Sequence, residues 1–460
     1  MDNTKESEKD EVEQSGRRLP RHVKSLLGFQ FFNSINFTIA IGTPMVLMAK
    51  FLGASEAIIG LLISLTPFFN ILQLPAATLA EHWGYKRLML AGWRTRTYLL
   101  FLLAPLPFLV GRVPSPVLVA VMFLVMLGYN ISRGFSSGSW YPWLKEILPE
   151  KLRGTYFGVE SRIINAGVLV TLLTTSMFLG KSAAGYQFGL LTVVAAIAGI
   201  MSLGFLKNAP GGEPVRNARD IGLFAVLAEV LGIWKHKPFF KITVLASIHS
   251  FALSAIPGFL VVYLSDRFLM ADNSIIFVSA ASTAGSLIMA PTLGRLSDRF
   301  GSRPIIRLGI ISNLILLFFW VIVGSRKDLV NVPTIACAYF LFGVAGSSYG
   351  IPMLRFVFGS CPKGRETVGF SIFQVTVSLF SGAAPIVWGF LIEFMHAHTS
   401  LDPFMIMFGT SLVLLVAANI FLSSLKEQDS IRTVTMIGKL LIELPAKLVT
   451  VFRPEGVGEN

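Results

Sequence analysis

The sequence predicts an all-α membrane protein with twelve transmembrane helices in two pseudo-symmetric six-helix bundles. Three observations support this fold class: long apolar runs, few charged residues, and a polar motif that occurs once in each half. The 460-residue chain is 53% hydrophobic and only 14% charged, whereas soluble domains carry about 25% charged residues. Open sheets are excluded from the hydrocarbon because their backbone polar groups would lack partners, so the apolar runs must be helices.

Twelve apolar runs reach the roughly 20 residues that a helix needs to cross a bilayer. They are too continuous for barrel strands, which alternate every second residue. Several approach the upper length limit, so we expect them to tilt or to extend beyond the bilayer. The predicted spans are residues 25–49, 56–80, 88–110, 116–143, 156–180, 187–206, 239–264, 273–297, 304–324, 333–359, 367–394 and 403–424.

The spans and the segments between them divide the chain into five regions. These are an N-terminal tail (1–24), a first bundle (25–206), a linker (207–238), a second bundle (239–424) and a C-terminal tail (425–460). The linker and the C-terminal tail each contain an amphipathic stretch, at 220–234 and 436–443. Each stretch predicts a helix that lies either at the membrane surface or against the protein's own cytoplasmic loops.

The distribution of lysine and arginine predicts that both termini are cytoplasmic. With twelve spans the termini share one side, and the loops of the other side contain six of the 39 Lys and Arg residues. Arg133, Arg162 and Arg355 lie within spans, which leaves thirty on the side of the termini when those at the helix entrances are included. Cationic loops stay in the cytoplasm, so we expect a multi-pass protein of a bacterial cytoplasmic (inner) membrane. The net charge of +13 is thus mostly a topology signal, and no base-reading element supports nucleic-acid binding.

A polar motif lies between the second and third spans of each half. The second signature loop reads GRLSDRFGSRP at 294–304, and the first signature loop reads ATLAEHWGYKR at 77–87. In both, a small residue, a leucine, an acid, a glycine and a basic residue keep the same spacing. This motif resembles the signature loop of the major facilitator superfamily of transporters, and the resemblance covers about residues 25–424.

The resemblance implies two six-helix bundles around a central cavity that opens alternately to either side. Substrate sites in such transporters lie near the midplane between the repeats. The acid of each loop, Asp298 and Glu81, is expected to help lock the outward-open state at the cytoplasmic face. Ala77 and His82 replace the family's usual glycine and arginine, so we expect a weaker first lock. The candidate gating residues of the two loops are Glu81, Gly84, Lys86, Arg87, Gly294, Asp298, Arg299, Gly301 and Arg303.

Arg133 is the main candidate for substrate binding. Placing an ionisable side chain at membrane depth costs at least ~2.5–3.5 kcal/mol of insertion free energy. Such a residue therefore indicates a functional or structural role. Arg133 lies roughly 18 Å from the cytoplasmic end of its helix, close to the midplane. At helical spacing it shares a polar and aromatic stripe that suits a cavity wall, with Tyr129, Asn130, Ser137 and Trp140. The alternative is a structural arginine that bonds to carbonyl groups of a neighbouring helix.

Two further helices carry polar candidates. Gln30, Asn33 and Phe37 share one face of the first helix and suit substrate hydrogen bonding, although amides also hold membrane helices together. His249, followed by Ser250, lies near mid-depth in the seventh helix. Its ordinary pKa is close to working pH, so it is a candidate carrier of a coupling proton. A lone histidine in an apolar helix is more often a packing residue.

A second set of charged residues lies closer to the cytoplasmic ends of the helices. We expect these residues to form a gating network of ion pairs, with direct proton coupling through Glu160 as the alternative. They are Arg94, Arg96, Glu160, Arg162 and, in the second half, Arg355.

These residues predict a secondary active or facilitative transporter. Helices 1, 4, 7, 8 and 10 contain no Asp or Glu at mid-depth, so the interior is net cationic and favours a small anionic or amphipathic organic solute. A facilitator, an anion exchanger and a proton symporter stay open, as does a transporter-like scaffold or sensor without transport. The histidines do not cluster with acids as a membrane enzyme or metal site requires. We therefore expect no enzyme activity and no cofactor, and a monomer.

Overall fold

The computed structural model describes residues 21–148, 150–214, 232–326, 329–362, 365–425, 427 and 433–439. This part of the chain is almost entirely helical and contains no β-strand. Eleven helices are long and apolar enough to cross a membrane. The third span, α6 (Tyr85–Leu103), is the twelfth helix and is less apolar, because it carries Lys86, Arg87, Arg94 and Arg96. The predicted fold class is confirmed.

The N-terminal half contains six spans, of which three are divided into two or three helical pieces. The elements are α2 (Arg21–Ile41) with α3 (Thr43–Phe51), α4 (Glu56–Phe68) with η1 (Phe69–Leu72) and α5 (Gln73–Trp83), α6, the short η2 (Leu106–Leu109), α7 (Ser115–Ser137) with α8 (Trp140–Ile147), α9 (Glu150–Leu179) and α10 (Gly185–Lys207).

The C-terminal half repeats this plan. Its elements are α12 (Lys237–Leu253) with α13 (Ile256–Phe268), α14 (Asp272–Phe300), α15 (Ser302–Ser325), α16 (Val332–Ser360), α17 (Glu366–His398) and α18 (Pro403–Ser423). Several helices extend beyond the predicted spans at the ends predicted to be cytoplasmic, as α9 does when it begins at Glu150.

The first helix of each half is interrupted by a proline near its middle. Pro44 follows the break between α2 and α3, and Pro257 follows the break between α12 and α13. Proline lacks a backbone N–H and clashes with the carbonyl group four residues earlier, so it ends or bends a helix. The equivalent position of the two breaks supports the predicted repeat.

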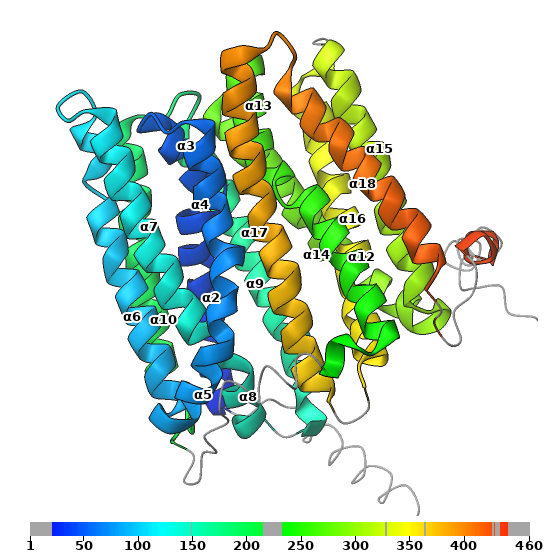
Figure 1. Ribbon diagram of the computed structural model, residues 1–460. Helices are drawn as coiled ribbons and strands as arrows, with labels where there is room; N and C mark the ends of the chain where they lie inside the picture. The colour runs from blue at the N-terminus through cyan, green and yellow to red at the C-terminus, as the bar shows by residue number, and fades with distance from the viewer. Residues whose placement is uncertain are drawn as a thin grey trace, which may run out of the picture.

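The two halves lie side by side and meet along two helix pairs, α4 with α17 and α9 with α14. In Figure 1, α6, α7 and α10 lie at the left of the molecule, in the N-terminal half. The helices α15 and α18 lie at the right, in the C-terminal half. The α4–α17 contact is very close at Gly60 and Gly389. A Cβ atom on Gly60 would collide with the carbonyl oxygen of Pro385, so this contact requires glycine.

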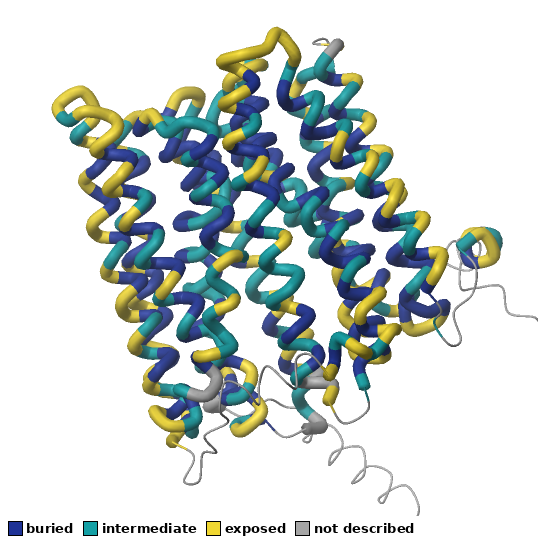
Figure 2. Tube along the Cα trace, viewed as in Figure 1, coloured by how far each residue is buried: buried dark blue, intermediate teal, exposed yellow. Residues whose placement is uncertain are grey.

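The outer surfaces of the helices are apolar. Figure 2 shows exposed residues along the outer sides of the bundle, and among them are large side chains such as Leu124, Val413 and Ile420. Exposed apolar area on this scale would favour aggregation in water, so the surface suits contact with lipid.

The predicted linker and tail helices fall largely outside the described residues. Of the stretch 220–234 the structure describes 232–234, and of the tail it describes a short helix at 433–439. Met436 in this short helix is fully buried against Leu293, Phe300 and Ile305. This contact corresponds to the alternative in which the tail packs on the protein's own cytoplasmic loops. The domain boundaries stay a prediction.

Candidate substrate cavity and gates

A cavity of about 380 Å³ lies between the two halves. Its wall combines hydroxyl groups with apolar and aromatic side chains, and it contains no Lys, Arg, Asp or Glu. The lining residues are Phe37, Thr38, Ile41, Gly42, Thr43, Val168 and Leu172 from the N-terminal half, and Pro257, Leu260, Ser279, Ser282, Thr283, Trp320, Ala338, Tyr339 and Phe342 from the C-terminal half. Both halves therefore contribute to one site.

The side that is predicted to be extracellular is closed over this cavity. Thr43 and Ser279 join α3 to α14 through their hydroxyl groups, 3.0 Å apart. Farther out, Lys50 forms an ion pair with Asp266 of the other half. In Figure 1, α3 and α13 approach each other at this end of the molecule.

A second closure joins α4 to α17 at the same outer end. The backbone N–H of Ala57 donates to Oε2 of Glu393 at 3.0 Å, and Nδ1 of His396 lies 3.3 Å from Oε1 of Glu56. By contrast, the described contacts of the two signature loops, given below, are made within their own halves. The halves are thus joined at the end predicted to be extracellular, while the described loop contacts at the other end stay within a half or reach its linker or tail. With the predicted orientation, this arrangement would correspond to an inward-facing state.

One of the ten predicted substrate residues, Phe37, lines this cavity. Arg133 lies instead against the second span, where its guanidinium donates to the carbonyl oxygen of Thr66 and to Oδ1 of Asn70, the latter at 3.0 Å. Asn130 accepts from the hydroxyl group of Thr66 at 2.9 Å. In this conformation Arg133 thus has the contacts of the structural alternative, and its role in substrate binding stays a prediction.

The other predicted residues of helices 1 and 4 lie inside the N-terminal bundle. Asn33 accepts from Nε1 of Trp93 at 3.1 Å and from the guanidinium of Arg96. The hydroxyl group of Tyr129 donates to Asn36 at 2.8 Å. Ser137 bonds to the carbonyl group of Gly134 in its own helix, and Trp140 packs on Phe29. Most of these contacts join neighbouring helices. They correspond to the alternative in which polar side chains hold the helices together and do not bind substrate.

His249 is buried in the C-terminal bundle and stacks on Tyr349, with the ring centroids 3.4 Å apart and the planes almost parallel. Neither His249 nor Ser250 lines the cavity. The sequence predicts that these polar side chains lie near mid-depth. It does not show which neighbouring helix each face contacts, so the predicted substrate cluster is dispersed over both bundles.

The acid of the second signature loop forms an ion pair within its own half, and its gating role stays a prediction. Asp298 and Arg355 form an ion pair at 3.1 Å, with side chains that are 80% and 51% exposed. Arg355 also donates to the carbonyl oxygen of Ser297 at 2.8 Å, so it fixes the end of α14. Arg299 stacks on Phe300, and Gly294 is partly exposed with open space where a side chain would be.

The turn of the second loop is capped by the C-terminal tail. Gly301 has a φ of 88°, a backbone conformation that favours glycine. The backbone N–H groups of Ser302 and Arg303 donate to the carboxylate of Glu427 at 2.9 and 2.8 Å. Arg303 also donates to the carbonyl oxygen of Ser423 at 2.8 Å. A carboxylate at the N-terminus of α15 satisfies unpaired N–H groups and complements the helix dipole.

The first signature loop has the same turn but different partners. Gly84 has a φ of 91°. The backbone N–H of Lys86 donates to the carbonyl oxygen of Gly212 at 3.2 Å, and its ammonium group donates to that of Ala209 at 2.6 Å. The start of the linker therefore takes the place that the tail has in the other half. Glu81 is partly exposed and Arg87 is exposed.

The predicted ion pairs among Glu160, Arg162, Arg94 and Arg96 are not formed in the described part of the chain. Glu160 is buried and accepts from Nε2 of Gln30 at 2.5 Å. Arg96 is 1% exposed and turns into the bundle, whereas Arg94 and Arg162 are exposed. Residues two apart on a helix point in nearly opposite directions, so Arg94 and Arg96 cannot serve the same gate.

Sequence reasoning missed the outer closure. Lys50 and Asp266 were visible as single charges at the outer ends of spans, and His396 as an outer-loop residue. No motif links them, because each pair joins segments more than 200 residues apart. Glu427 was missed because no motif links it to Ser302, which lies 125 residues away in the sequence.

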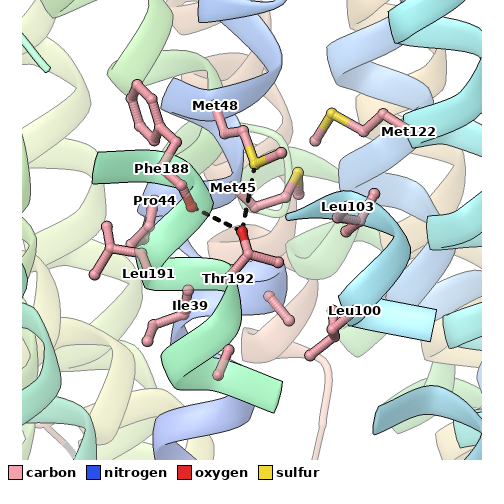
Figure 3. Close-up of a pocket in the computed structure, with 12 residues that line it drawn as sticks. Ile39, Pro44, Met45, Met48, Leu100, Leu103, Met122, Phe188, Leu191 and Thr192 are labelled. Carbon is pink, nitrogen blue, oxygen red and sulfur yellow. Dashed lines mark hydrogen bonds between the residues drawn. The ribbon is translucent and has the colours of Figure 1, made fainter. Parts of the chain in front are cut away.

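A second, much smaller void lies inside the N-terminal bundle (Figure 3). Its volume is about 20 Å³, which is enough for about one water molecule. Figure 3 shows Met45, Met48 and Met122 around it, and the hydroxyl group of Thr192 bonding to the carbonyl oxygen of Phe188. Its size excludes it as a substrate site.

A sequence model of the Major Facilitator Superfamily matches residues 26–271 and 242–453. The chain belongs to this superfamily. This finding agrees with the signature loops and with the two halves of the fold. Membership in a transporter superfamily also confirms the expectation that the protein is not an enzyme.

Two curated relatives are bacterial transporters of the superfamily. The ectoine/proline transporter ProP of Corynebacterium glutamicum is 24% identical over 317 residues, 62% of this chain and 61% of the relative. A putative proline/betaine transporter of Staphylococcus haemolyticus is 24% identical over 299 residues, 58% of this chain and 59% of the relative. The chain thus matches about three-fifths of the length of these relatives.

Solved transporter structures share the whole fold. The nucleoside transporter NupG has a TM-score of 0.61 at 16% identity, over 87% of this chain and 99% of that one. A POT family transporter in complex with 5-aminolevulinic acid has a TM-score of 0.68 at 13% identity, over 89% and 97%. A bacterial homologue of Spinster in an inward-facing, unoccupied conformation has a TM-score of 0.61 at 14% identity, over 87% and 95%. At this identity the likeness concerns the fold alone.

Proposed function

We propose that this protein is a secondary active or facilitative transporter that moves a small amphipathic organic solute across the membrane by alternating access. The observation that carries this proposal is the cavity shared by both halves and closed on the outer side. A solute held between the halves contacts both of them, so a movement of one half against the other transfers it from one side to the other.

The wall of the cavity supports a solute with little net charge. Thr38 on one side and Ser282 and Thr283 on the other offer hydrogen bonds, while Phe37 and Trp320 offer apolar and aromatic surface. A pocket of this kind orients a ligand with few polar groups and holds its body by apolar contact. The names of the two curated relatives include proline, betaine and ectoine, and these solutes are zwitterions without net charge.

An anionic solute is the second candidate, and it depends on Arg133. The guanidinium group uses its described hydrogen bonds on Thr66 and Asn70. An anion would therefore have to replace these partners during the transport cycle. The uncharged cavity makes the amphipathic solute the better candidate.

Uptake into proteoliposomes tests the proposal, with proline and glycine betaine as the first probes and a panel of organic anions as the second. Ser282→Trp fills the cavity and should abolish uptake of any transported probe. Leu124→Trp adds the same side chain on a lipid-exposed position and should leave uptake unchanged. Transport by Ser282→Trp at the normal rate would place the solute path elsewhere. Binding without uptake by the unaltered protein would favour the scaffold or sensor.

We infer that both termini are cytoplasmic and that the protein resides in a bacterial inner membrane, as the cation distribution and the bacterial relatives support. A cysteine at the exposed outer-loop position Ala397 should react with an impermeant maleimide in intact cells, and a cysteine at Lys207 should not. The reverse pattern would overturn the orientation. A monomeric state and proton coupling through His249 stay predictions.

A further inference from the structure

The outer face of α6 carries two arginines in a stripe that continues into the lipid-exposed surface. The exposed residues follow helical spacing: Arg87, Ala91, Arg94, Tyr98, Phe101 and Leu102. The helix packs on α7 and α10 and lies at the left edge of the molecule in Figure 1. Figure 2 shows exposed residues along this edge. Since the stripe ends in Phe101 and Leu102, it is the face that α6 turns toward lipid.

Arg94 lies unusually deep for a cation on such a face. It is roughly 14 Å from the start of α6 at 1.5 Å per residue. Gly92, two residues earlier, packs closely against Ser132 and Ser136 of α7, so Arg94 is near the depth of Arg133. A guanidinium that faces hydrocarbon at this depth is unfavourable unless it reaches water or an anion.

The protein supplies no such partner in the part of the chain that is described. No hydrogen bond or ion pair to Arg94 is found there, whereas Arg96 is bonded to Asn33 and stacks on Trp93, 4.3 Å from the ring centroid. The long side chain of Arg94 can extend toward the membrane surface and place its charge at the head groups. At the head groups, the anion within reach of the guanidinium is a lipid phosphate.

The surroundings of Arg94 suit a phospholipid head group. Arg87 lies two turns nearer the predicted cytoplasmic side on the same face, and the small Ala91 between them leaves room. Trp83, just before the start of α6, is 54% exposed, and tryptophan favours the membrane interface.

We propose that Arg94 and Arg87 form a binding site for the phosphate group of an anionic phospholipid in the leaflet predicted to be cytoplasmic. The planar guanidinium of Arg94 donates two parallel hydrogen bonds to phosphate oxygens, and Arg87 adds a second positive charge. An ammonium group lacks the forked geometry of a guanidinium, so lysine would be a weaker substitute.

Thermal unfolding of the full-length protein in an uncharged detergent tests this site. Phosphatidylglycerol is titrated, with phosphatidylcholine of the same acyl chains and inorganic phosphate as separate arms. We expect phosphatidylglycerol to raise the unfolding temperature saturably and the other two to leave it nearly unchanged. In Arg94→Leu the half-saturating concentration should increase at least tenfold, and in Arg94→Lys by a smaller factor. Arg112→Leu, which removes an exposed outer-loop cation, should behave as the unaltered protein does.

Arg94→Leu removes no described contact, so it should fold, which size-exclusion chromatography checks. An unchanged half-saturating concentration in this variant would overturn the site. An equal effect of inorganic phosphate would overturn the assignment to a lipid. An Arg94→Lys protein that binds as tightly as the unaltered one would overturn the two-bond geometry.

Discussion

The two halves of this protein share one fold but place their charged side chains at different depths. In the N-terminal half, Arg96 and Arg133 are buried near mid-depth and hydrogen-bonded to neighbouring helices. In the C-terminal half the corresponding depth holds the stack of His249 on Tyr349. There the charged contacts lie at the helix ends: Arg355 meets Asp298 and Glu427 caps α15 at the end predicted to be cytoplasmic, and Arg267 meets Asp402 at the other end.

This difference indicates a division of roles between the repeats. Buried charged hydrogen bonds hold helices in fixed positions, because breaking them leaves polar groups without partners. Exposed ion pairs contribute little to stability and can be exchanged at small cost. We therefore expect the N-terminal half to be the stiffer body and the C-terminal half to carry the adjustable cytoplasmic gate.

Arg96→Ala should have the largest effect on stability. Hydrogen bonds to charged groups contribute about 1.5–3 kcal/mol, and a desolvated cation–π contact adds roughly 2 kcal/mol. Arg96 makes both, with Asn33, Trp93 and Tyr129 as partners. Thermal unfolding should show a large decrease in this variant and a small one in His249→Phe, which keeps the ring on Tyr349. A larger loss in His249→Phe would reverse the assignment of the stiffer half.

Arg133→Ala should lower stability more than it lowers solute affinity. Thr66 and Asn70 lose a charged donor, at about 1.5–3 kcal/mol, while the cavity wall is unchanged. Solute titration and melting curves on the same preparation measure the two effects. If the affinity instead falls by the 2–5 kcal/mol expected for truncating a buried charged contact, with the melting temperature kept, Arg133 is the anchor of an anionic substrate.

Asp298→Asn should impair transport while equilibrium binding stays within a few-fold. The exposed pair with Arg355 sets the balance between states, and coupling of this kind typically amounts to about 1–3 kcal/mol. Glu81→Gln in the first loop is the matched control and should have a smaller effect, since Glu81 has no described ion pair. Rates and affinities in proteoliposomes compare them. Loss of binding in a stable Asp298→Asn protein would end the gating assignment.

Glu427→Gln should have the smallest effect, a decrease of about 1 kcal/mol in stability, as for the loss of a helix N-cap. Glutamine keeps the size of the side chain and one acceptor but loses the charge at the N-terminus of α15. The first loop offers no matching variant, because the carbonyl group of Gly212 serves there. Equal melting temperatures would mean that the tail does not stabilise the second loop.

Much of the fold could be predicted from the sequence, and less of the site. Spans, repeat and loops follow from apolar runs and from glycine spacing, which are local patterns. The pair of Asp298 with Arg355 was within reach because both residues lie at cytoplasmic helix ends. Arg133 shows the limit of prediction from local sequence. Its position along the helix and its polar stripe can be read from neighbouring residues, but the helix that the stripe faces depends on tertiary packing. The cavity hydroxyls of Ser282 and Thr283 resemble those of any membrane helix, so no pattern distinguished them.

The close approach of α4 and α17 at Gly60 and Gly389 limits how the outer side can open. A seal made of side chains can loosen one rotamer at a time. Here backbone touches backbone, and neither glycine has a side chain to turn aside. Separation must therefore move whole helices, and with them each half as a rigid body. A partial opening would leave the backbones of α4 and α17 in contact. The closed and open forms should therefore be two discrete states, without intermediate conformations between them.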